Sequence, residues 1–151
     1  MSRAIQQDYT TNITLEQESK RLGLPLNYCW FKDTLKNISK NGGYIINLAN
    51  EGDPGTHWTI LYKEGSNYAW FDPFGAVPPL VVQEKLPKYL YNATVIQNPS
   101  KGFCGSYSIE FLQYMHENKH IPFRQRFQNF LNMFSDNFHK NEKILRKLEK
   151  N

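Results

Sequence analysis

The fold is decided by the stretch HWTILYKEGSNYAWF, residues 57–71. Both ends of this stretch are rich in β-branched and aromatic residues, and the polar segment KEGSN between them contains a glycine. Two apolar runs of strand length around a short polar segment are typical of a β-hairpin. We therefore expect two antiparallel strands, His57–Tyr62 and Tyr68–Phe71, joined by a turn.

Outward from the hairpin, strands are expected in the middle of the chain and helices at both ends. The first helix is expected to open with a capping box at Thr14–Gln17. The elements expected outside the hairpin are helix 15–22, strand 44–48, helix 81–91, strand 93–96 and helices 104–117, 123–134 and 138–150. This arrangement predicts an α+β fold with a central, mostly antiparallel sheet flanked by helices.

Length and composition favour one globular domain over residues 1–151. The chain is 40% apolar and 15% aromatic, which is enough for a core and too aromatic for a disordered chain. It has no apolar run of membrane-spanning length, and its polar start, Met1–Thr11, is unlike a signal peptide. We therefore expect no membrane association and no secretion by that route. Two cysteines, Cys29 and Cys104, cannot form a disulfide framework, so a reducing compartment with free thiols is expected.

Positive charge is concentrated at the C-terminal end. Five of the basic residues follow His139, together with two glutamates, so residues 139–151 carry +3 of the net charge of +4. These basic residues are Lys140, Lys143, Arg146, Lys147 and Lys150. Phe138, Leu145 and Leu148 recur at helical spacing, so a solvated helix face docked through these three residues is one interpretation. A footprint for nucleic acid is the other.

Three residues with catalytic chemistry fall at the ends of expected elements. His57 begins one strand of the hairpin, Asp72 ends the other, and Cys104 begins a helix. The hairpin brings the start of its first strand near the end of its second, so Asp72 is placed to hold the His57 imidazole by a hydrogen bond. A thiol at a helix N-terminus next to a histidine is favoured as thiolate. Each residue alone has an ordinary structural explanation, but their joint placement favours a cysteine nucleophile.

Gln97 supplies a fourth part. It is expected to end the strand 93–96, which leads into the loop before Cys104. Its side-chain amide and the backbone N–H of Cys104 are then placed to donate to a developing oxyanion. Gly102 and Gly105 leave room for a close approach of backbone or substrate.

These motifs resemble the adenain-like cysteine proteases, the maturation proteases of adenoviruses and related double-stranded DNA viruses and virophages. The segments that carry the resemblance are Gly55–Trp58, Trp70–Gly75 and Gln97–Gly105. They share the order His, acid, Gln, Cys and the spacing from Gln to Cys. The opening helix, the strand before the histidine and the basic C-terminal helix also have counterparts, so the likeness covers most of the chain.

The resemblance implies an adenain-like protease architecture with the nucleophile at a helix N-terminus. His57 would be the general base and acid, Asp72 its orienting residue, Cys104 the nucleophile and Gln97 the oxyanion donor. Trp58 and Gly105 would line a narrow substrate groove that favours small residues such as Gly before the scissile bond. The implied substrates are viral capsid precursor proteins, and the implied locations are the host cytoplasm or nucleus and the virion, with the protease a monomer.

Two departures from the family concern regulation and the acid. The adenoviral enzymes have Glu at the position of Asp72, a change that other members of the clan share. They also have a cysteine before the oxyanion Gln that binds an activating peptide through a disulfide, and residues 84–96 contain none. We therefore expect no activation of that kind and no cofactor for the chemistry. The basic C-terminal end is compatible with activation by viral DNA. The residues expected to bind the DNA are Lys143, Arg146, Lys147 and Lys150.

Three alternatives stay open from the sequence. The segment His116–His120 matches the HExxH signature of zinc metallopeptidases. However, Ile121–Pro122 follows it, and a residue before proline is disfavoured in a helix, so the second histidine falls on a fraying helix end. Proteases that remove SUMO or ubiquitin-like proteins share the order His, Asp, Gln, Cys. A non-enzymatic DNA-binding module is the third alternative, and it leaves the four catalytic residue types unexplained.

Overall fold

The computed structural model describes residues 11–52 and 57–150. The expectations for the polar start and for residues 53–56, which include Gly55 and Thr56 of the family motif, lie outside the described residues. In chain order the elements are α1 (Asn12–Arg21), β1 (Leu26–Phe31), the 3-10 helix η1 (Lys32–Thr34), β2 (Gly42–Asn47), β3 (Trp58–Glu64), β4 (Asn67–Phe71), α2 (Leu80–Gln83), β5 (Leu90–Tyr91), α3 (Cys104–Glu117), α4 (Phe123–Leu131) and α5 (Phe138–Glu149).

The strands form one sheet in the order β1-β2-β3-β4-β5. β3 pairs antiparallel with β4, as the hairpin predicts, and antiparallel with β2. Both edge strands pair parallel with their neighbours, β1 with β2 and β5 with β4. The sheet is therefore mixed, and the expectation of a mostly antiparallel sheet is wrong. Each edge strand is separated from its partner by a segment containing a short helix, and such a crossover returns the chain in the same direction.

Several expected elements differ from the structure. Strand β1 was not predicted. Most of 81–91 is not helical, because Pro87 cannot continue a helix and only α2 forms, directly after Pro79. The expected strand 93–96 is absent, since the Ile96 amide donates to the carbonyl of Pro73 (2.8 Å) and joins no strand ladder.

The helix boundaries agree more closely. α3 spans Cys104–Glu117 as predicted, while α4 and α5 end slightly earlier than expected. α1 begins earlier, because Thr11 is its N-cap and Thr14 is the third helical residue of the capping box, not its first member. None of the helices in residues 11–52 and 57–150 is long and apolar enough to cross a membrane.

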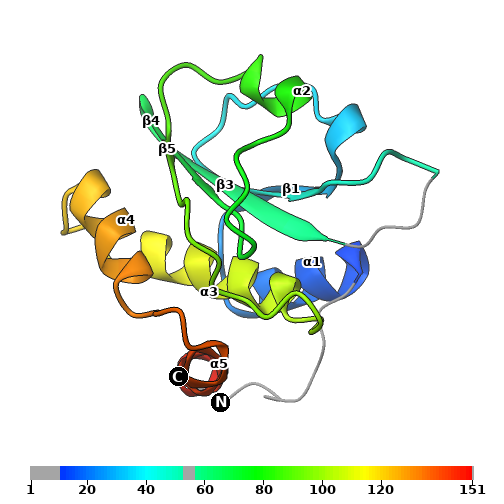
Figure 1. Cartoon of the computed structure of the whole chain (residues 1–151). Helices are drawn as coiled ribbons and strands as arrows, with labels where there is room; N and C mark the ends of the chain where they lie inside the picture. The colour runs from blue at the N-terminus through cyan, green and yellow to red at the C-terminus, as the bar shows by residue number, and fades with distance from the viewer. Residues whose placement is uncertain (1–10, 53–56, 151) are drawn as a thin grey trace.

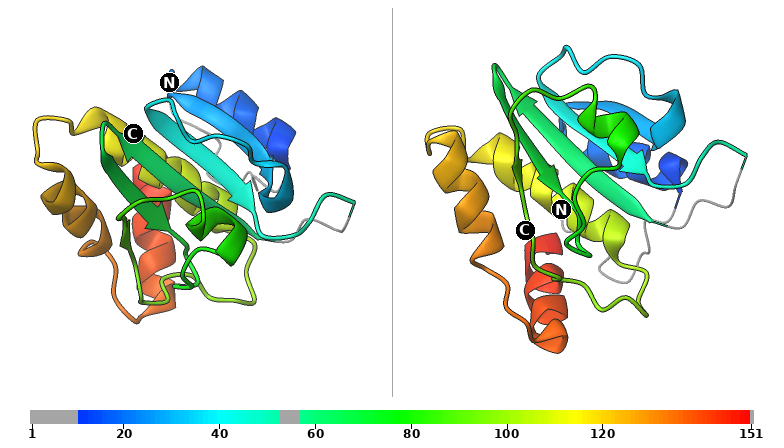
Figure 2. Two further views of the ribbon diagram at one scale, coloured as in Figure 1. Left: turned by 90° about the horizontal axis from the view of Figure 1, so that it is seen from above. Right: turned by 45° about the horizontal axis from the view of Figure 1, so that its top comes forward.

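Side chains alternate between the two faces of the sheet, and both faces are covered. Ile45, Ile60 and Phe71 belong to the larger core on the face covered by α1 and α3, which lie next to each other (Figures 1 and 2). Ile46 and Trp70 belong to a smaller core on the opposite face, where α2 lies. Both faces of β2 are therefore covered, and all six of its residues are buried.

Helix α3 packs close to the sheet at Gly43. A Cβ atom at this position would lie 2.8 Å from Cδ1 of Leu112, closer than a nonbonded carbon contact allows. The absence of a side chain at Gly43 thus lets α3 lie directly on β2. This packing fixes the helix whose first residue is Cys104.

Candidate active site

His57 and Asp72 are joined at one edge of the sheet. His57 directly precedes β3 and Asp72 directly follows β4, so the hairpin brings them together. Nε2 of His57 lies 2.6 Å from Oδ1 of Asp72, and both side chains are buried. The imidazole stacks on Phe74, with ring centroids 4.0 Å apart and planes inclined by 4°. The ring of His57 is therefore held both at its edge and at its face.

The Asp72 carboxylate is oriented by the turn that follows it. Oδ1 also accepts from the Phe74 amide (2.8 Å), and Oδ2 accepts from the Ala76 amide (3.3 Å). Gly75, with φ at +75°, allows this turn, which also brings the chain against Thr94. The carboxylate therefore faces His57 with its other oxygen already occupied.

Asn92 holds the backbone of Asp72 on both sides. Its Oδ1 accepts from the Asp72 amide (3.0 Å), and its Nδ2 donates to the Asp72 carbonyl (2.6 Å). Asn92 is only 1% exposed, and its Nδ2 also donates to the carbonyl of Thr94 (3.2 Å). Sequence reasoning missed this residue, because a single asparagine after a short strand gives no local signal of such a role.

Cys104 is the first residue of α3 and lies against the start of β3. Its Sγ accepts a hydrogen bond from the Trp58 amide at 3.4 Å, and the thiol is 6% exposed. Phe103, the N-cap residue, has no hydrogen-bonding side chain, so it cannot cap the first backbone N–H groups of α3. These N–H groups and the positive end of the helix dipole favour negative charge at Cys104.

The environment of His57 favours its protonated form. Burial lowers the pKa of the imidazole, but the carboxylate of Asp72, which is hydrogen-bonded to it, and the neighbouring side chain of Cys104 both favour the charged imidazolium. Together they outweigh burial and raise the pKa of His57 from 6.5 to about 9. Because Nε2 is bonded to Asp72, Nδ1 is the nitrogen left for proton exchange with Cys104, and it has no hydrogen-bond partner among the described residues.

Gln97 lies at a bend in a segment without regular secondary structure and does not end a strand, contrary to the expectation. Its backbone N–H donates to the carbonyl of Pro73 (3.0 Å), the residue after Asp72. This bond ties the backbone at Gln97 to the turn that follows Asp72. Its Nε2 donates to the Lys101 carbonyl (2.7 Å), within the loop that leads to Cys104. Since the side-chain amide nitrogen carries two protons, the bond to Lys101 leaves one of them for a further acceptor.

The two residues expected to line a substrate groove are mostly buried. The Trp58 side chain is 5% exposed and packs in the larger core together with Cys104. Gly105, the second residue of α3, is also buried. Both are adjacent in sequence to a catalytic candidate, which places them beside the thiol.

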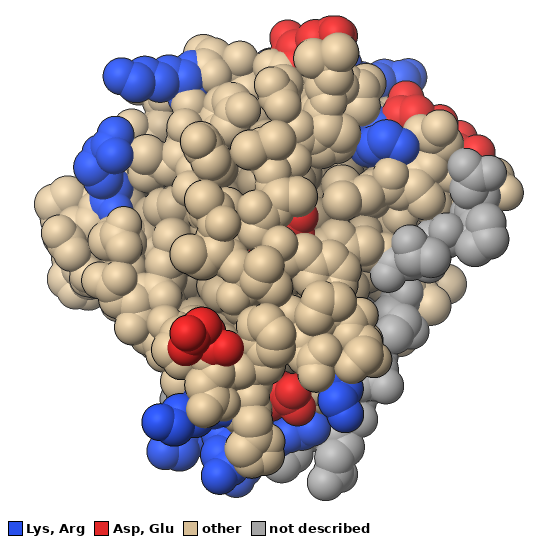
Figure 3. All heavy atoms as spheres, viewed as in Figure 1, with Lys and Arg blue, Asp and Glu red and all other residues tan. Residues whose placement is uncertain are grey.

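The basic residues of α5 and of its C-cap, Lys150, divide into two groups. Lys143, Lys147 and Lys150 are exposed. In Figure 3, Lys and Arg side chains gather at the bottom of the molecule, where α5 lies in Figure 1. Arg146 is half-buried, with its guanidinium over the ring of Phe103 at 5.4 Å from the centroid.

The buried face of α5 also differs from the expectation. Asn141, Leu145 and Glu149 are its buried residues, whereas Phe138 and Leu148 are only partly buried. The helix therefore docks through a face that contains two polar side chains.

The HExxH segment does not form a helical metal site. His116 lies in the last turn of α3, whereas His120 lies beyond its end at Glu117, so the two histidines do not share a helix. Within residues 11–52 and 57–150, no three His, Cys, Asp or Glu side chains are close enough to hold a metal ion.

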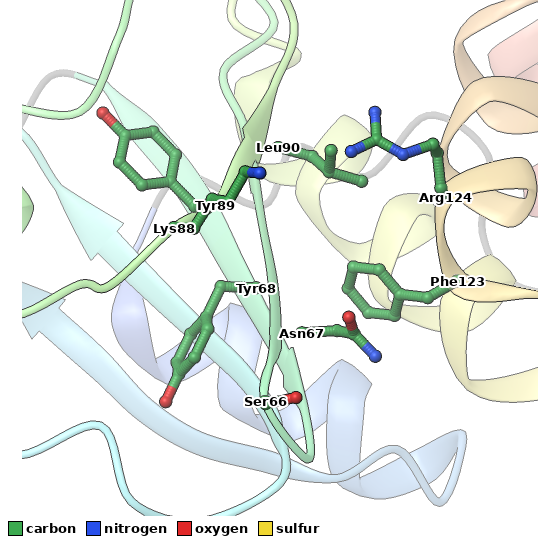
Figure 4. A pocket seen from close by; sticks show the side chains of 8 residues that line it. All are labelled: Ser66, Asn67, Tyr68, Lys88, Tyr89, Leu90, Phe123 and Arg124. Atoms are coloured by element: carbon green, nitrogen blue, oxygen red, sulfur yellow. The ribbon is translucent and has the colours of Figure 1, made fainter.

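A separate pocket lies at the far end of the sheet from Cys104. It has a volume of about 200 Å³ and is lined by residues of the β3–β4 turn, the segment before β5 and the start of α4 (Figure 4). Lys88 and Arg124 supply its positive charge, and Tyr68, Tyr89 and Phe123 its aromatic rings. Because α3 separates this region from Cys104, with a length of about 21 Å for its 14 residues, the pocket is not part of the candidate active site.

The fold is similar to that of the ASFV pS273R protease. One crystal structure of that protease matches with a TM-score of 0.54 and 13% sequence identity, over 94% of this chain and 66% of the protease chain. A selenomethionine crystal structure matches with a TM-score of 0.47 and 18% identity, over 70% of this chain and 43% of that one. This chain therefore spans less than two thirds of the protease chains that it matches. The sequence matches no family model and no curated protein.

Proposed function

We propose that this chain is a cysteine endopeptidase of the adenain-like type. The observation that carries the proposal is the buried pair of His57 and Asp72, 2.6 Å apart, beside a thiol at the first residue of α3. The shared fold with the ASFV pS273R protease supports the same reaction class. A thiol in a helix N-terminus next to a histidine with a raised pKa is the environment that a nucleophilic thiolate requires.

The reaction follows from these positions. His57 takes the proton of the Cys104 thiol, and the thiolate adds to the scissile carbonyl, whose oxygen becomes an oxyanion. The Gln97 amide and the Cys104 N–H donate to that oxyanion. When the tetrahedral intermediate collapses, the C–N bond breaks and His57 returns its proton to the leaving amine. Water, activated by His57, then hydrolyses the thioester and frees the carboxylate product.

Asp72 acts on His57 without touching the substrate. It keeps Nε2 of the imidazole bonded, so Nδ1 is directed to the proton transfer, and its charge stabilises the imidazolium. Asn92 and the Phe74 and Ala76 amides hold Asp72 in that orientation. The acid is therefore a positioning residue for the general base.

The proposed substrates are viral capsid precursor proteins, cleaved after small residues such as Gly. The family resemblance in Gly55–Trp58, Trp70–Gly75 and Gln97–Gly105 supports this substrate class. The buried positions of Trp58 and Gly105 next to Cys104 are consistent with little space for a side chain before the scissile bond. The host cytoplasm or nucleus and the virion are the proposed locations, and a monomer the proposed state.

DNA is the proposed regulator, and the exposed lysines of α5 are the observation that favours it. Lys143, Lys147 and Lys150 offer a row of positive charge suited to a phosphate backbone. Arg146 is left out of this surface, because its guanidinium is packed on Phe103. The chemistry itself needs no cofactor, since every proposed catalytic group is a residue of the chain.

Cleavage of candidate precursors tests the function directly. The purified chain is incubated with viral capsid precursor proteins, and new termini are mapped by mass spectrometry, with Cys104→Ser as the matched control. We expect new termini after small residues with the unaltered chain and none with the variant. Cleavage only at the C-terminus of a SUMO or ubiquitin-like conjugate would instead assign the deconjugating activity. Cleavage that persists in Cys104→Ser and stops with a chelator would refute the cysteine mechanism.

A further inference from the structure

The C-terminal helix α5 contacts the residues that directly precede both proposed oxyanion donors. Asn141 donates through Nδ2 to the carbonyl of Ile96 (2.9 Å), the residue before Gln97. Arg146 lies over the ring of Phe103, the residue before Cys104, at 5.4 Å. These two contacts come from successive turns of one helix, which packs against α3 on its side away from the sheet (Figures 1 and 2).

The contact with Ile96 fixes a single peptide group. The carbonyl of Ile96 and the N–H of Gln97 belong to the same planar unit. The carbonyl accepts from Asn141 (2.9 Å), and the N–H donates to the Pro73 carbonyl (3.0 Å), next to the catalytic acid. With both ends bonded, this plane cannot rotate without breaking a hydrogen bond. That plane fixes the N–Cα bond from which the Gln97 side chain extends, and the bond from Nε2 to the Lys101 carbonyl holds the other end of the side chain.

Asn141 lies on the buried face of α5 and not on its solvent-exposed face. It is fully buried, its Oδ1 accepts from the Ser135 amide (2.9 Å), and its Nδ2 also donates to the Ser135 carbonyl (2.8 Å). An apolar residue at this position would leave the Ile96 carbonyl without this donor. A buried polar residue that only docked the helix would not need to reach Ile96, because Leu145 already docks α5 in the core.

We propose that α5 is a positioning element of the oxyanion hole, with Asn141 holding Gln97 and Arg146 holding the start of α3. The proposal rests on the function proposed above, because it assigns to α5 the alignment of donors that matter only in catalysis. Asn141 and Arg146 are positioning residues and do not contact the substrate. Loss of their contacts lowers turnover and leaves the nucleophile and substrate affinity in place.

A double-mutant cycle with Gln97 tests this role. The probe is a peptide ending in Gly-Gly that is coupled to a fluorogenic coumarin amine, and kcat and KM are measured for Asn141→Ala and Asn141→Asp. Asn141→Asp keeps an acceptor for the Ser135 amide and removes the donor to the carbonyls of Ile96 and Ser135. We expect kcat to fall about 10- to 100-fold with KM changed less than about twofold, the pattern of a misplaced transition-state donor. In a Gln97→Ala background the same substitution should change kcat less than about twofold, because the donor it aligns is already absent.

Matched variants on the same helix separate positioning from general loosening. Arg146→Gln should lower kcat, whereas Lys140→Gln, an equal loss of charge at an exposed position of α5, should not. Leu145→Ala should lower the melting temperature. At assay temperatures well below that melting temperature, its kcat should be unchanged. Equal losses of kcat in both Gln97 backgrounds, or an equal loss in Leu145→Ala, would overturn the proposal. If Asn141→Ala does not fold, Asn141→Asp and Arg146→Gln decide by the same criteria.

The cycle also distinguishes this inference from the proposed function. If Gln97→Ala retains full activity, the assignment of the oxyanion hole fails. If Gln97→Ala loses activity and the Asn141 and Arg146 variants keep it, only the role of α5 fails.

Discussion

The imidazole of His57 and the carboxylate of Asp72 are 2.6 Å apart, although 15 positions separate them in the chain. The separation is bridged by one hairpin, β3–β4, whose outer ends carry the two residues. The stack of Phe74 on the imidazole and the backbone bonds to the carboxylate restrain both partners. This relationship underlies the predictions for the thiol and for pH dependence.

Iodoacetamide should label Cys104 faster than Cys29 in the native protein. Burial, reinforced by Glu16, raises the pKa of the Cys29 thiol, so this thiol stays protonated at neutral pH. Cys104 is equally buried but lies next to a protonated imidazole at a helix N-terminus. Labelling is followed by peptide mass spectrometry over time. Equal rates, or faster labelling of Cys29, would contradict an activated Cys104.

Activity should decline as the pH rises through about 9. The pKa of His57 is raised in the folded protein to about 9, so the imidazolium that stabilises the thiolate is lost above that value. The same shift adds stability that is fully present below about pH 6.5 and is lost as the pH rises through about 9. Both kcat/KM and the melting temperature are measured from about pH 6 to about pH 10.

The control for this pH profile is Asp72→Asn. Without the carboxylate, His57 loses the hydrogen bond and the attraction of Asp72 that raise its pKa, so the pKa falls. The alkaline limb of the activity profile should move to lower pH, with a lower maximum. An unchanged limb would mean that His57 does not govern it.

Gln97→Ala should lower kcat by about 100- to 1000-fold, the usual effect of removing one oxyanion donor. Because the buried Gln97 side chain also bonds to the Lys101 carbonyl, a loss of about 1 kcal/mol in the free energy of unfolding is expected as well. Cys104 labelling by iodoacetamide should stay close to the rate of the unaltered chain. A fully active variant would rule out Gln97 as the donor.

Asn92→Ala should reduce both stability and activity. The substitution leaves the buried amide and carbonyl of Asp72 without their side-chain partner, at a cost of about 1 to 3 kcal/mol each. The released Asp72 no longer holds His57 in one orientation, so kcat should fall more than KM rises. Asn92→Asp, which keeps the acceptor for the Asp72 amide, should lose less stability. Chemical denaturation and steady-state kinetics measure the two effects.

DNA affinity should depend steeply on salt and weakly on sequence. Replacing Lys143, Lys147 and Lys150 with Gln should flatten the plot of log affinity against log salt by about 0.9 for each phosphate that the lysines no longer neutralise. Arg146 is kept in this variant, because its packing on Phe103 serves the fold of the site. Fluorescence anisotropy with a duplex of arbitrary sequence gives the slope. No salt-dependent binding by the unaltered chain near physiological ionic strength would leave α5 as a solvated face.

The elements with local signals could be predicted from the amino-acid sequence. The hairpin followed from two apolar runs around a polar, glycine-containing segment, and its geometry was enough to predict that His57 and Asp72 lie together. The bounds of α3 followed from the glycine-containing loop before Cys104 and the turn before Pro122. Each signal lies within a few residues of the feature that it predicts.

The contacts that hold the segment before Cys104 could not be predicted, because they join parts of the chain that are distant in sequence. The pattern of Ala93–Ile96 is that of a strand, but the Ile96 amide bonds to Pro73 and its carbonyl to Asn141, 45 residues away. The parallel pairing of β1 with β2, and of β5 with β4, likewise depends on crossovers whose direction no local pattern encodes. A polar residue such as Asn92 or Asn141 has the same local pattern whether it is solvated or buried. Its burial and its partners are set by segments that meet only when the chain folds, and this is why these residues had to be found in the structure.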